Sequence, residues 1–400
     1  MDGSTSTAVT TGLAPLLATR EILIFCGSGG VGKTTIAAAA ALAVVKNSSA
    51  KVMVLTIDPA RRLADALGLE SLGNVETRVP DAALIDAGVA PKGELYAAML
   101  DTKASWDDLV TRYAPSQEVA DNIFSNDLYH NITSRFIQSH DYIAMERLFQ
   151  LHSSGVYDLI ILDTPPTRHA VDFLDAPKRM ADFFGGRLLR WLTLPYRTGG
   201  GRGGRLINIA SKPFLKIADR ILGNAFVEDI AEFFINFQSM YDGFVERSKA
   251  VEQLLHDRRT SFVVTTTLEG APLREAEAYC EQLNNRNLPL GALVLNKVLP
   301  DFLRDSLGQK ASAVFSDNPA AVAKAIASKG ADQSEMDAIA RVLKTAADTF
   351  MNYSLVAERE FELKVELSKR PEMMAAVPLL VDDVHDLAAL AQIGDRLWAS

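Results

Sequence analysis

The sequence predicts an α/β fold in which a doubly wound, mostly parallel sheet carries a P-loop and an inserted α-helical subdomain. Two observations support this prediction. Short apolar runs typical of buried strands alternate with segments of helical spacing, which is the order of strand–helix–strand units. A glycine-rich stretch, residues 27–35, also joins the first apolar run to the first helical segment. With 400 residues, the chain is long enough for one large domain with a subdomain.

The predicted elements follow one another along most of the chain. Apolar runs bounded by turn residues predict strands, and they lie at residues 22–26, 51–57, 95–100, 157–163, 261–266, 288–298 and 375–380. Helical spacing of apolar side chains predicts helices between them, at residues 36–45, 106–113, 143–151, 271–285, 356–370 and 384–398. We expect the segments between residues 300 and 370 to lie outside the sheet.

Composition excludes several classes of protein. The chain has 48% hydrophobic and 23% charged residues, which is typical of a globular protein and not of a disordered or fibrous one. Its net charge of −9 argues against a nucleic-acid partner, since binding phosphates needs a broad basic surface. The two cysteines, Cys26 and Cys280, cannot form a disulfide framework and lack the paired spacing of a zinc site, so we expect a reducing, cytoplasmic compartment.

The sequence also predicts how the chain is divided. Residues 1–20 lack the basic region of a signal peptide, and we interpret them as a flexible N-terminal tail. Residues 21–400 then form a single domain with helical insertions at about 93–155 and 178–256. The longest fully apolar run, residues 36–45, is too short to span a bilayer, so we expect no transmembrane segment.

Residues 27–35 match the phosphate-binding pattern G-x-x-x-x-G-K-[ST], with a predicted strand before them and a predicted helix after them. The glycines let backbone N–H groups point at phosphate oxygens, Lys33 adds a positive charge, and Thr34 offers its hydroxyl to Mg²⁺. The sequence therefore predicts a nucleoside triphosphate site built from Gly27, Ser28, Gly29, Gly30, Val31, Gly32, Lys33, Thr34 and Thr35.

Polar side chains end three of the later predicted strands. Asp58 follows the strand over 51–57, where it is well placed for phosphate chemistry, although a turn or cap residue before Pro59 is the alternative. Asp163 ends an apolar strand in the arrangement by which a carboxylate orients the shell of Mg²⁺. Asn296 ends another strand, and its amide can pair with an adenine edge.

A basic and apolar segment lies in the second predicted insertion. Residues 187–220 hold eight basic side chains against one acidic residue, interleaved with apolar side chains and broken by the glycine-rich residues 199–204. A wide apolar stripe over residues 226–245 follows. This combination is typical of a surface that contacts a hydrophobic cargo, and the alternative is a helical hairpin with a solvated basic face.

These motifs, followed by Val377-Pro378-Leu379-Leu380, occur in the order of the arsenite-pump and guided-entry ATPase family, and the chain resembles its bacterial anion-transporting members over nearly its whole length. The resemblance implies a dimeric ATPase that converts ATP and water to ADP and phosphate. It implies that Asp58 orients or deprotonates the attacking water and that Asp163 supports Mg²⁺. It also implies that Asn296 reads adenine and that Glu275 and Pro378 contact the nucleotide.

The sequence departs from the family pattern at Ser28, where the family usually has a lysine that reaches across the dimer to the partner's phosphates. Its absence predicts slow hydrolysis unless another cation substitutes. Candidates are Arg61, Arg62 and Arg168, or a paralogous partner subunit that makes the working unit a heterodimer instead of a homodimer. The paired cysteines of a zinc-bridged dimer and the cysteine triads of arsenite pumps are absent.

We therefore expect a Mg²⁺-dependent ATPase whose nucleotide-driven closure moves the helical insertions. These would handle a hydrophobic or membrane-protein client through residues 187–245, in a guided-entry-like targeting or chaperone role. One alternative is an anion or metalloid efflux ATPase subunit, with only Cys26 and Cys280 as thiolate ligands. The other is a weakly hydrolysing, nucleotide-gated scaffold that acts with a paralogous partner.

Overall fold

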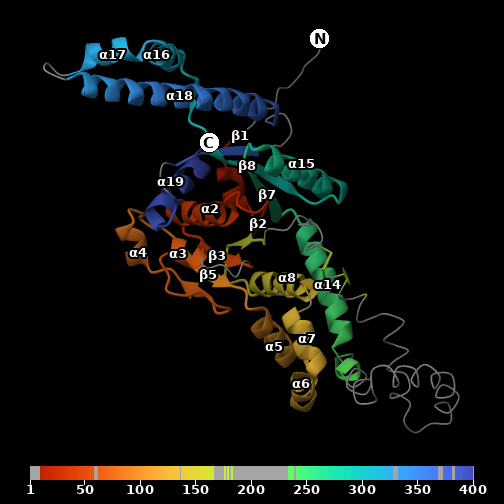
Figure 1. Ribbon diagram of the computed structural model, residues 1–400. Helices are drawn as coiled ribbons and strands as arrows, with labels where there is room; N and C mark the ends of the chain where they lie inside the picture. The colour runs from red at the N-terminus through yellow and green to blue at the C-terminus, as the bar shows by residue number, and fades with distance from the viewer. Residues whose placement is uncertain are drawn as a thin grey trace, which may run out of the picture.

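The computed structural model describes residues 10–57, 62–135, 137–165, 175–176, 178–179, 182, 233–237, 240–327, 332–367, 373–380 and 383–399. In these residues nine strands form one sheet, in the order β1-β9-β8-β7-β2-β6-β3-β5-β4 (Figure 1). Every neighbouring pair is parallel except β5 and β4, which are antiparallel. The prediction of a mostly parallel, doubly wound sheet is confirmed.

The strands at the centre of the sheet are the predicted apolar runs. They are β2 (Ile22–Cys26), β3 (Lys51–Thr56), β6 (Leu159–Asp163), β7 (Thr260–Thr266) and β8 (Leu290–Val298). Near the edges lie β4 (Thr77–Arg78), β5 (Glu94–Met99) and β9 (Met373–Pro378). Later strands flank β2 on both sides, so the carboxyl end of β2 lies where ligands bind in open α/β sheets.

Helices cover both faces of the sheet, which is why β2, β6 and β7 are buried at every position instead of at alternate ones. One face packs on α2 (Lys33–Asn47), α3 (Arg62–Ala66), α4 (Asp81–Asp86) and α19 (Leu387–Trp398). Helices α2 and α19 approach closely at Gly394. A Cβ at this position would lie 2.7 Å from the Ala39 carbonyl oxygen, so the approach needs glycine. The other face packs on α8 (Ile137–Ser153), α14 (Tyr241–His256) and α15 (Gly270–Asn285).

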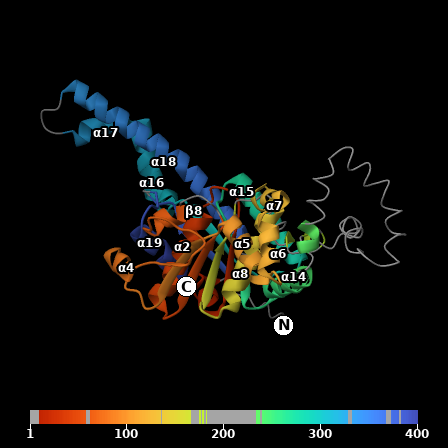
Figure 2. The ribbon, with the colours of Figure 1, turned by 90° about the horizontal axis from the view of Figure 1, so that it is seen from below.

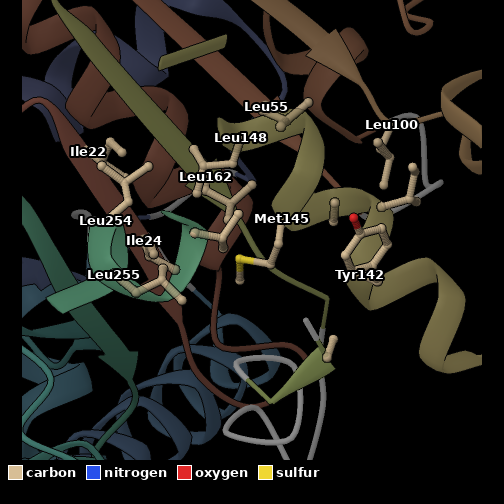
Figure 3. Packing of buried hydrophobic residues seen from close by; sticks show 14 of the residues in the cluster. Ile22, Ile24, Leu55, Leu100, Tyr142, Met145, Leu148, Leu162, Leu254 and Leu255 are labelled. Carbon is tan, nitrogen blue, oxygen red and sulfur yellow. The ribbon is translucent and has the colours of Figure 1, made fainter. Parts of the chain in front are cut away.

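The core on this second face joins strands to helices far apart in the sequence (Figure 3). Side chains of β2, β3 and β6 meet Met145 and Leu148 of α8 and Leu254 and Leu255 of α14. A buried ion pair also joins these two helices, since Arg247 Nε lies 2.9 Å from Glu146 Oε1. Burial raises the pKa of Glu146 above its usual value.

The first predicted insertion, residues 93–155, begins with strand β5 and becomes helical only at residue 102. Its helices are α5 (Thr102–Tyr113), α6 (Gln117–Phe124), α7 (Asp127–Arg135) and α8. Trp106 is buried and packs against the rings of Tyr142, Phe237 and Phe244, so the aromatic residues of this region form core.

Most of the second predicted insertion, including the basic segment 187–220, lies outside the described residues. The described part of the apolar stripe over 226–245 faces inward, because Phe233, Phe237 and Phe244 are each 1% exposed. This part of the stripe therefore contributes to the core and is not open to a client.

The prediction of a flexible tail over residues 1–20 is wrong for residues 10–20. Strand β1 (Thr10–Thr11) pairs with β9, and α1 (Ala14–Thr19) follows it. Leu13 and Leu16 are buried, and the Leu13 N–H donates to the Leu397 carbonyl oxygen at 2.7 Å. A strand of two residues has no sequence period, and its partner lies some 360 residues away, so nothing in the sequence signals the pairing.

A helical arm, which we define as residues 301–327 and 332–367, projects away from the sheet (Figures 1 and 2). It consists of η1 (Asp301–Arg304), α16 (Ser306–Asp317), α17 (Pro319–Ile326) and the 35-residue α18 (Gln333–Leu367). Its surface includes exposed apolar side chains, such as Leu307 and Leu355, which are 72% and 74% exposed. The Leu299 N–H donates to Glu360 Oε2 at 2.9 Å and so joins α18 to the end of β8. Over the described residues 301–327 and 332–367, these helices confirm that the segments between residues 300 and 370 lie outside the sheet.

Candidate nucleotide-binding site

The glycine-rich loop connects β2 to α2 at the carboxyl edge of the sheet. Gly27, Gly30 and Gly32 have φ of +148°, +82° and +89°, a region that L side chains rarely adopt. A Cβ at Gly27 would lie 2.1 Å from the Thr265 carbonyl oxygen, so the loop also needs glycine to pass β7. The glycine pattern in the sequence is therefore a steric requirement of this turn.

Lys33 is the first residue of α2 and points back along the loop. Its side chain is buried, at 6% exposure, and Nζ donates to the Ser28 carbonyl oxygen at 3.0 Å. The ammonium group thus lies beside the N-terminus of α2, where backbone N–H groups and the helix dipole favour an anion. A phosphate in this loop would meet both positive contributions.

Thr34 and Asp163 are brought together as the sequence predicts. Thr34 Oγ1 donates to Asp163 Oδ2 at 2.7 Å, and Thr56 Oγ1 donates to the same oxygen at 3.0 Å. Asp163 is fully buried at the end of β6, and Thr56 ends the neighbouring strand β3. The carboxylate is therefore held at a fixed point beside the start of α2.

This pair fits a magnesium ion. Hydroxyl and carboxylate oxygens are hard ligands, and Mg²⁺ commonly takes only one or two of them from the protein, with water and substrate phosphates as the rest. Thr34 and Asp163 offer that number. Among the described residues no group of three or more His, Cys, Asp and Glu side chains is arranged to hold a metal by itself. The donors suit an ion that arrives with a nucleotide.

A pocket of about 450 Å³ opens beside the loop. Gly32, Thr34 and Thr35 line one side, while Asn296 and Pro378 lie among the residues that line the remainder. This volume lies in the range of small-molecule sites. The structure thus brings Asn296, which lies near the end of β8, and Pro378, which ends β9, to one cavity with the loop. The remaining lining residues are Arg62, Asp65, Ala66, Lys297, Val377, Leu379, Leu380, Asp383, Val384, His385 and Ile393.

Asn296 supports the loop from the side of β8. Its Nδ2 donates to the Val31 carbonyl oxygen at 2.8 Å, and its Oδ1 accepts from the Lys297 N–H at 2.9 Å. A Cβ at Gly32 would lie 2.3 Å from Asn296 Nδ2, so glycine is also needed here for close packing. Adenine recognition by Asn296 stays a prediction, and it would use the second amide hydrogen or replace the bond to Val31.

Comparison with known proteins decides the family. A model of the anion-transporting ATPase family matches residues 20–317, which is well over half of the chain. The chain belongs to the anion-transporting ATPase family. It is 24% identical over 289 residues to a putative arsenical pump-driving ATPase 2 of Aquifex aeolicus, a match that covers 71% of this chain and 82% of the relative.

The chain is also similar to two further relatives. An ATPase ASNA1 homolog of Entamoeba dispar is 22% identical over 279 residues, covering 68% of this chain and 75% of the relative. The ATPase get3 of Schizosaccharomyces pombe is 26% identical over 276 residues, covering 69% and 72%. The family match ends at Asp317, the last residue of α16, so α17 and α18 lie beyond it.

Ser28, where this chain departs from the family pattern, contacts Glu275. Ser28 Oγ donates to Glu275 Oε2 at 2.5 Å, which links the loop to α15. Glu275 does not line the pocket, and its predicted contact with a nucleotide stays a prediction. Of the three arginines predicted to replace the lysine, Arg62 is exposed and lines the pocket, while Arg61 and Arg168 lie outside the described residues, as does Asp58.

Sequence reasoning missed two residues at this site. Thr56 ends an apolar strand as a single polar residue, which is a weak signal, yet its hydroxyl positions Asp163. Lys297 follows Asn296 and lines the pocket, but one lysine near the end of a strand has no recognisable pattern.

Proposed function

We propose that this member of the anion-transporting ATPase family binds ATP with Mg²⁺ and hydrolyses it to ADP and phosphate. The observation that carries the proposal is the hydrogen bond between Thr34 and Asp163 beside a loop of phosphate-binding geometry. Asp163 and Lys33 are both buried near the N-terminus of α2. Burying a charged side chain without a charged partner costs free energy, and a turn that binds no nucleotide would not need these two side chains there.

Each residue has a separate task in this mechanism. The backbone N–H groups of the loop bind the phosphates, and Lys33 exchanges the Ser28 carbonyl oxygen for a phosphate oxygen. Thr34 and Asp163 would hold Mg²⁺, which supplies positive charge against the charge that develops on the leaving phosphate. Asp58 orients or deprotonates the attacking water, a role that follows from the family resemblance and from its place after β3.

We further propose that nucleotide binding closes a dimer and that closure controls binding of a hydrophobic client, as in guided-entry targeting. The dimer is a homodimer or a heterodimer with a paralogous ATPase. Support comes from the family resemblance, the basic and apolar composition of residues 187–220, and the exposed apolar side chains of the helical arm. None of the helices in the described parts of the chain has both the length and the hydrophobicity to cross a membrane.

A nucleotide-gated scaffold with little hydrolysis is the second candidate. Ser28 favours it, because the residue that would reach a partner's phosphates is replaced by one that binds Glu275 of its own chain. Thiolate-based metalloid efflux receives less support. Cys26 is 1% exposed, and burial raises its pKa to about 12, so its thiolate is scarce at neutral pH.

ATP turnover by the purified full chain, measured with Mg²⁺ and with EDTA, tests the proposal. We expect Lys33→Ala to lower Mg²⁺-dependent turnover by roughly 10²–10³-fold, since it removes a charge aimed at the transferred group. Lys310→Ala, an exposed lysine of the arm, is the matched control and should turn over ATP like the wild type. ATP binding with equal, background turnover in the wild type and K33A would select the scaffold, and no ATP binding would refute both candidates.

A further inference from the structure

Lys297 has an unusual backbone conformation at the edge of the nucleotide pocket. Its φ is +57°, and among the described residues only one other non-glycine residue, Asn287, has a positive φ. The pairing of β8 with β9 shifts register between Leu295 and Val298, so residues 296 and 297 form an irregularity in the strand. Such irregularities near active sites redirect side chains, and strained residues gather at functional sites.

The strain is supported locally. The Lys297 N–H donates to Asn296 Oδ1, and Asn296 Nδ2 in turn donates to the Val31 carbonyl oxygen. Asn296 is 6% exposed, so this two-bond chain is mostly protected from water. The backbone of residue 297 is therefore linked to the loop through the side chain of Asn296.

The redirected side chain reaches the glycine-rich loop. Lys297 Nζ lies 3.4 Å from the Gly30 carbonyl oxygen, and the residue lines the same pocket as Gly32 and Thr34. This hydrogen bond is long, exposed and made to a neutral acceptor, so it is weak. A phosphate oxygen would be a stronger acceptor for the same ammonium group, because charge-assisted hydrogen bonds are roughly twice as strong.

Two lysine side chains contact the glycine-rich loop. Lys33 lies at the N-terminus of α2 with its ammonium group buried beneath Ser28, and Lys297 reaches over from β8. Arg62 also lines the pocket, with Asp65 and Asp383 as acidic neighbours in the lining. Lys297 donates to the loop at the Gly30 carbonyl oxygen, and Lys33 donates to it at the Ser28 carbonyl oxygen.

We infer that Lys297 binds the phosphate chain of the nucleotide, exchanging the Gly30 carbonyl oxygen for a phosphate oxygen. Lys297 would provide a second cation from the same chain. The loop has Ser28 at the position where the family usually has a lysine. The inference rests on the proposed function, since it needs a nucleotide in the pocket.

The first test measures binding of ATP, ADP and adenosine to the full chain by isothermal titration calorimetry with Mg²⁺. We expect Lys297→Gln to weaken ATP binding about tenfold, as for loss of a charged hydrogen bond, and to leave adenosine binding within about twofold of the wild type. Lys297→Arg keeps the charge and should bind ATP within about threefold of the wild type. Lys310→Gln on the arm is the matched control and should have no effect.

The second test uses the wild-type chain and does not depend on any variant folding. Lysine acylation followed by mass spectrometry should show that ATP, but not adenosine, slows modification of Lys297 about tenfold, because a bound ammonium is shielded. Lys310 should react at the same rate throughout.

The outcomes separate this inference from the proposed function. ATP binding by K297Q equal to that of the wild type, or an equal loss of ATP and adenosine binding, would overturn a phosphate contact by Lys297 and leave the proposed function standing. If K297Q does not fold, unchanged acylation of Lys297 in ATP would overturn the inference. A wild-type chain that binds no ATP would overturn both.

Discussion

The carboxyl edge of the sheet, which holds the candidate nucleotide site, and the helical arm differ in the contacts that hold them together. At the edge, short contacts join residues far apart in the sequence, as in the bonds from Thr34 to Asp163 and from Asn296 to Val31. In the arm, α18 packs mainly on α16 and α17, its neighbours in the chain. The family model matches the loop, Asp163 and Asn296 of the edge, but it ends at residue 317 inside the arm, before β9 and Pro378. We expect a ligand to restrict the residues of the first region and packing within the arm to restrict those of the second.

This difference predicts that a substitution in one region leaves the properties of the other region unchanged. The edge should lose activity with little loss of structure, and the arm should lose structure with little loss of nucleotide binding. Three sets of variants test whether the two regions are independent.

The largest effect is expected for Asp163→Asn at the edge. The asparagine keeps the size of the side chain but removes the charge that supports Mg²⁺, so we expect turnover to fall roughly 10²–10³-fold and its dependence on Mg²⁺ to weaken. Asp158→Asn is the matched control, because Asp158 lies at the other end of the same strand, where it accepts from the Lys51 N–H at 2.7 Å. Equal losses in D163N and D158N would indicate a general effect of charge removal on the strand.

A smaller effect is expected for Phe350→Ala in the arm. The ring of Phe350 packs over Gly308 of α16, where a Cβ would lie 2.7 Å from ring atom Cζ. Removing this half-buried ring should cost about 2 kcal/mol of local stability, or roughly 30-fold less protection from hydrogen exchange in α16 and α18. ATP affinity should stay within about twofold. Tyr353→Ala, at a 51% exposed position of the same helix, is the control, and lost ATP affinity in F350A alone would show that the regions are coupled.

The smallest effect is expected for the contact between the loop and α15. Ser28→Ala, Glu275→Ala and the double variant form a cycle, and we expect a coupling of about 0.5–1 kcal/mol in the free energy of unfolding, because the hydrogen bond is exposed. Glu281 is exposed on the same helix, so a cycle of S28A with Glu281→Ala should show no coupling. Equal coupling in both cycles would mean that the Ser28–Glu275 bond does not form in solution.

The sequence predicts the backbone of the glycine-rich loop well because the requirements of that turn are local. Positive φ at Gly30 and Gly32 can be inferred from the pattern itself, and parallel strands bring Asp163 to the loop once the strands are recognised. The Asp58 prediction falls on residues outside the described part of the chain.

The missed features depend on distant contacts or on conformation. Strand β1 exists only because β9 lies beside it, and two residues show no period. Lys297 acquires its position from an irregularity in β8 that no residue type marks. The helical spacing over residues 356–370 indicates a helix, but the 35-residue length of α18 becomes plain only from its packing against α16 and α17.

The hydrogen bond from the Leu299 N–H to Glu360 anchors the long helix of the arm two residues from Lys297. From Glu360 to Gln333, α18 extends about 40 Å at ~1.5 Å per residue, so a tilt of about 10° at the anchor would swing the far end by about 7 Å. A distance label near Gln333 would therefore magnify movements of β8 that are too small to follow at the pocket.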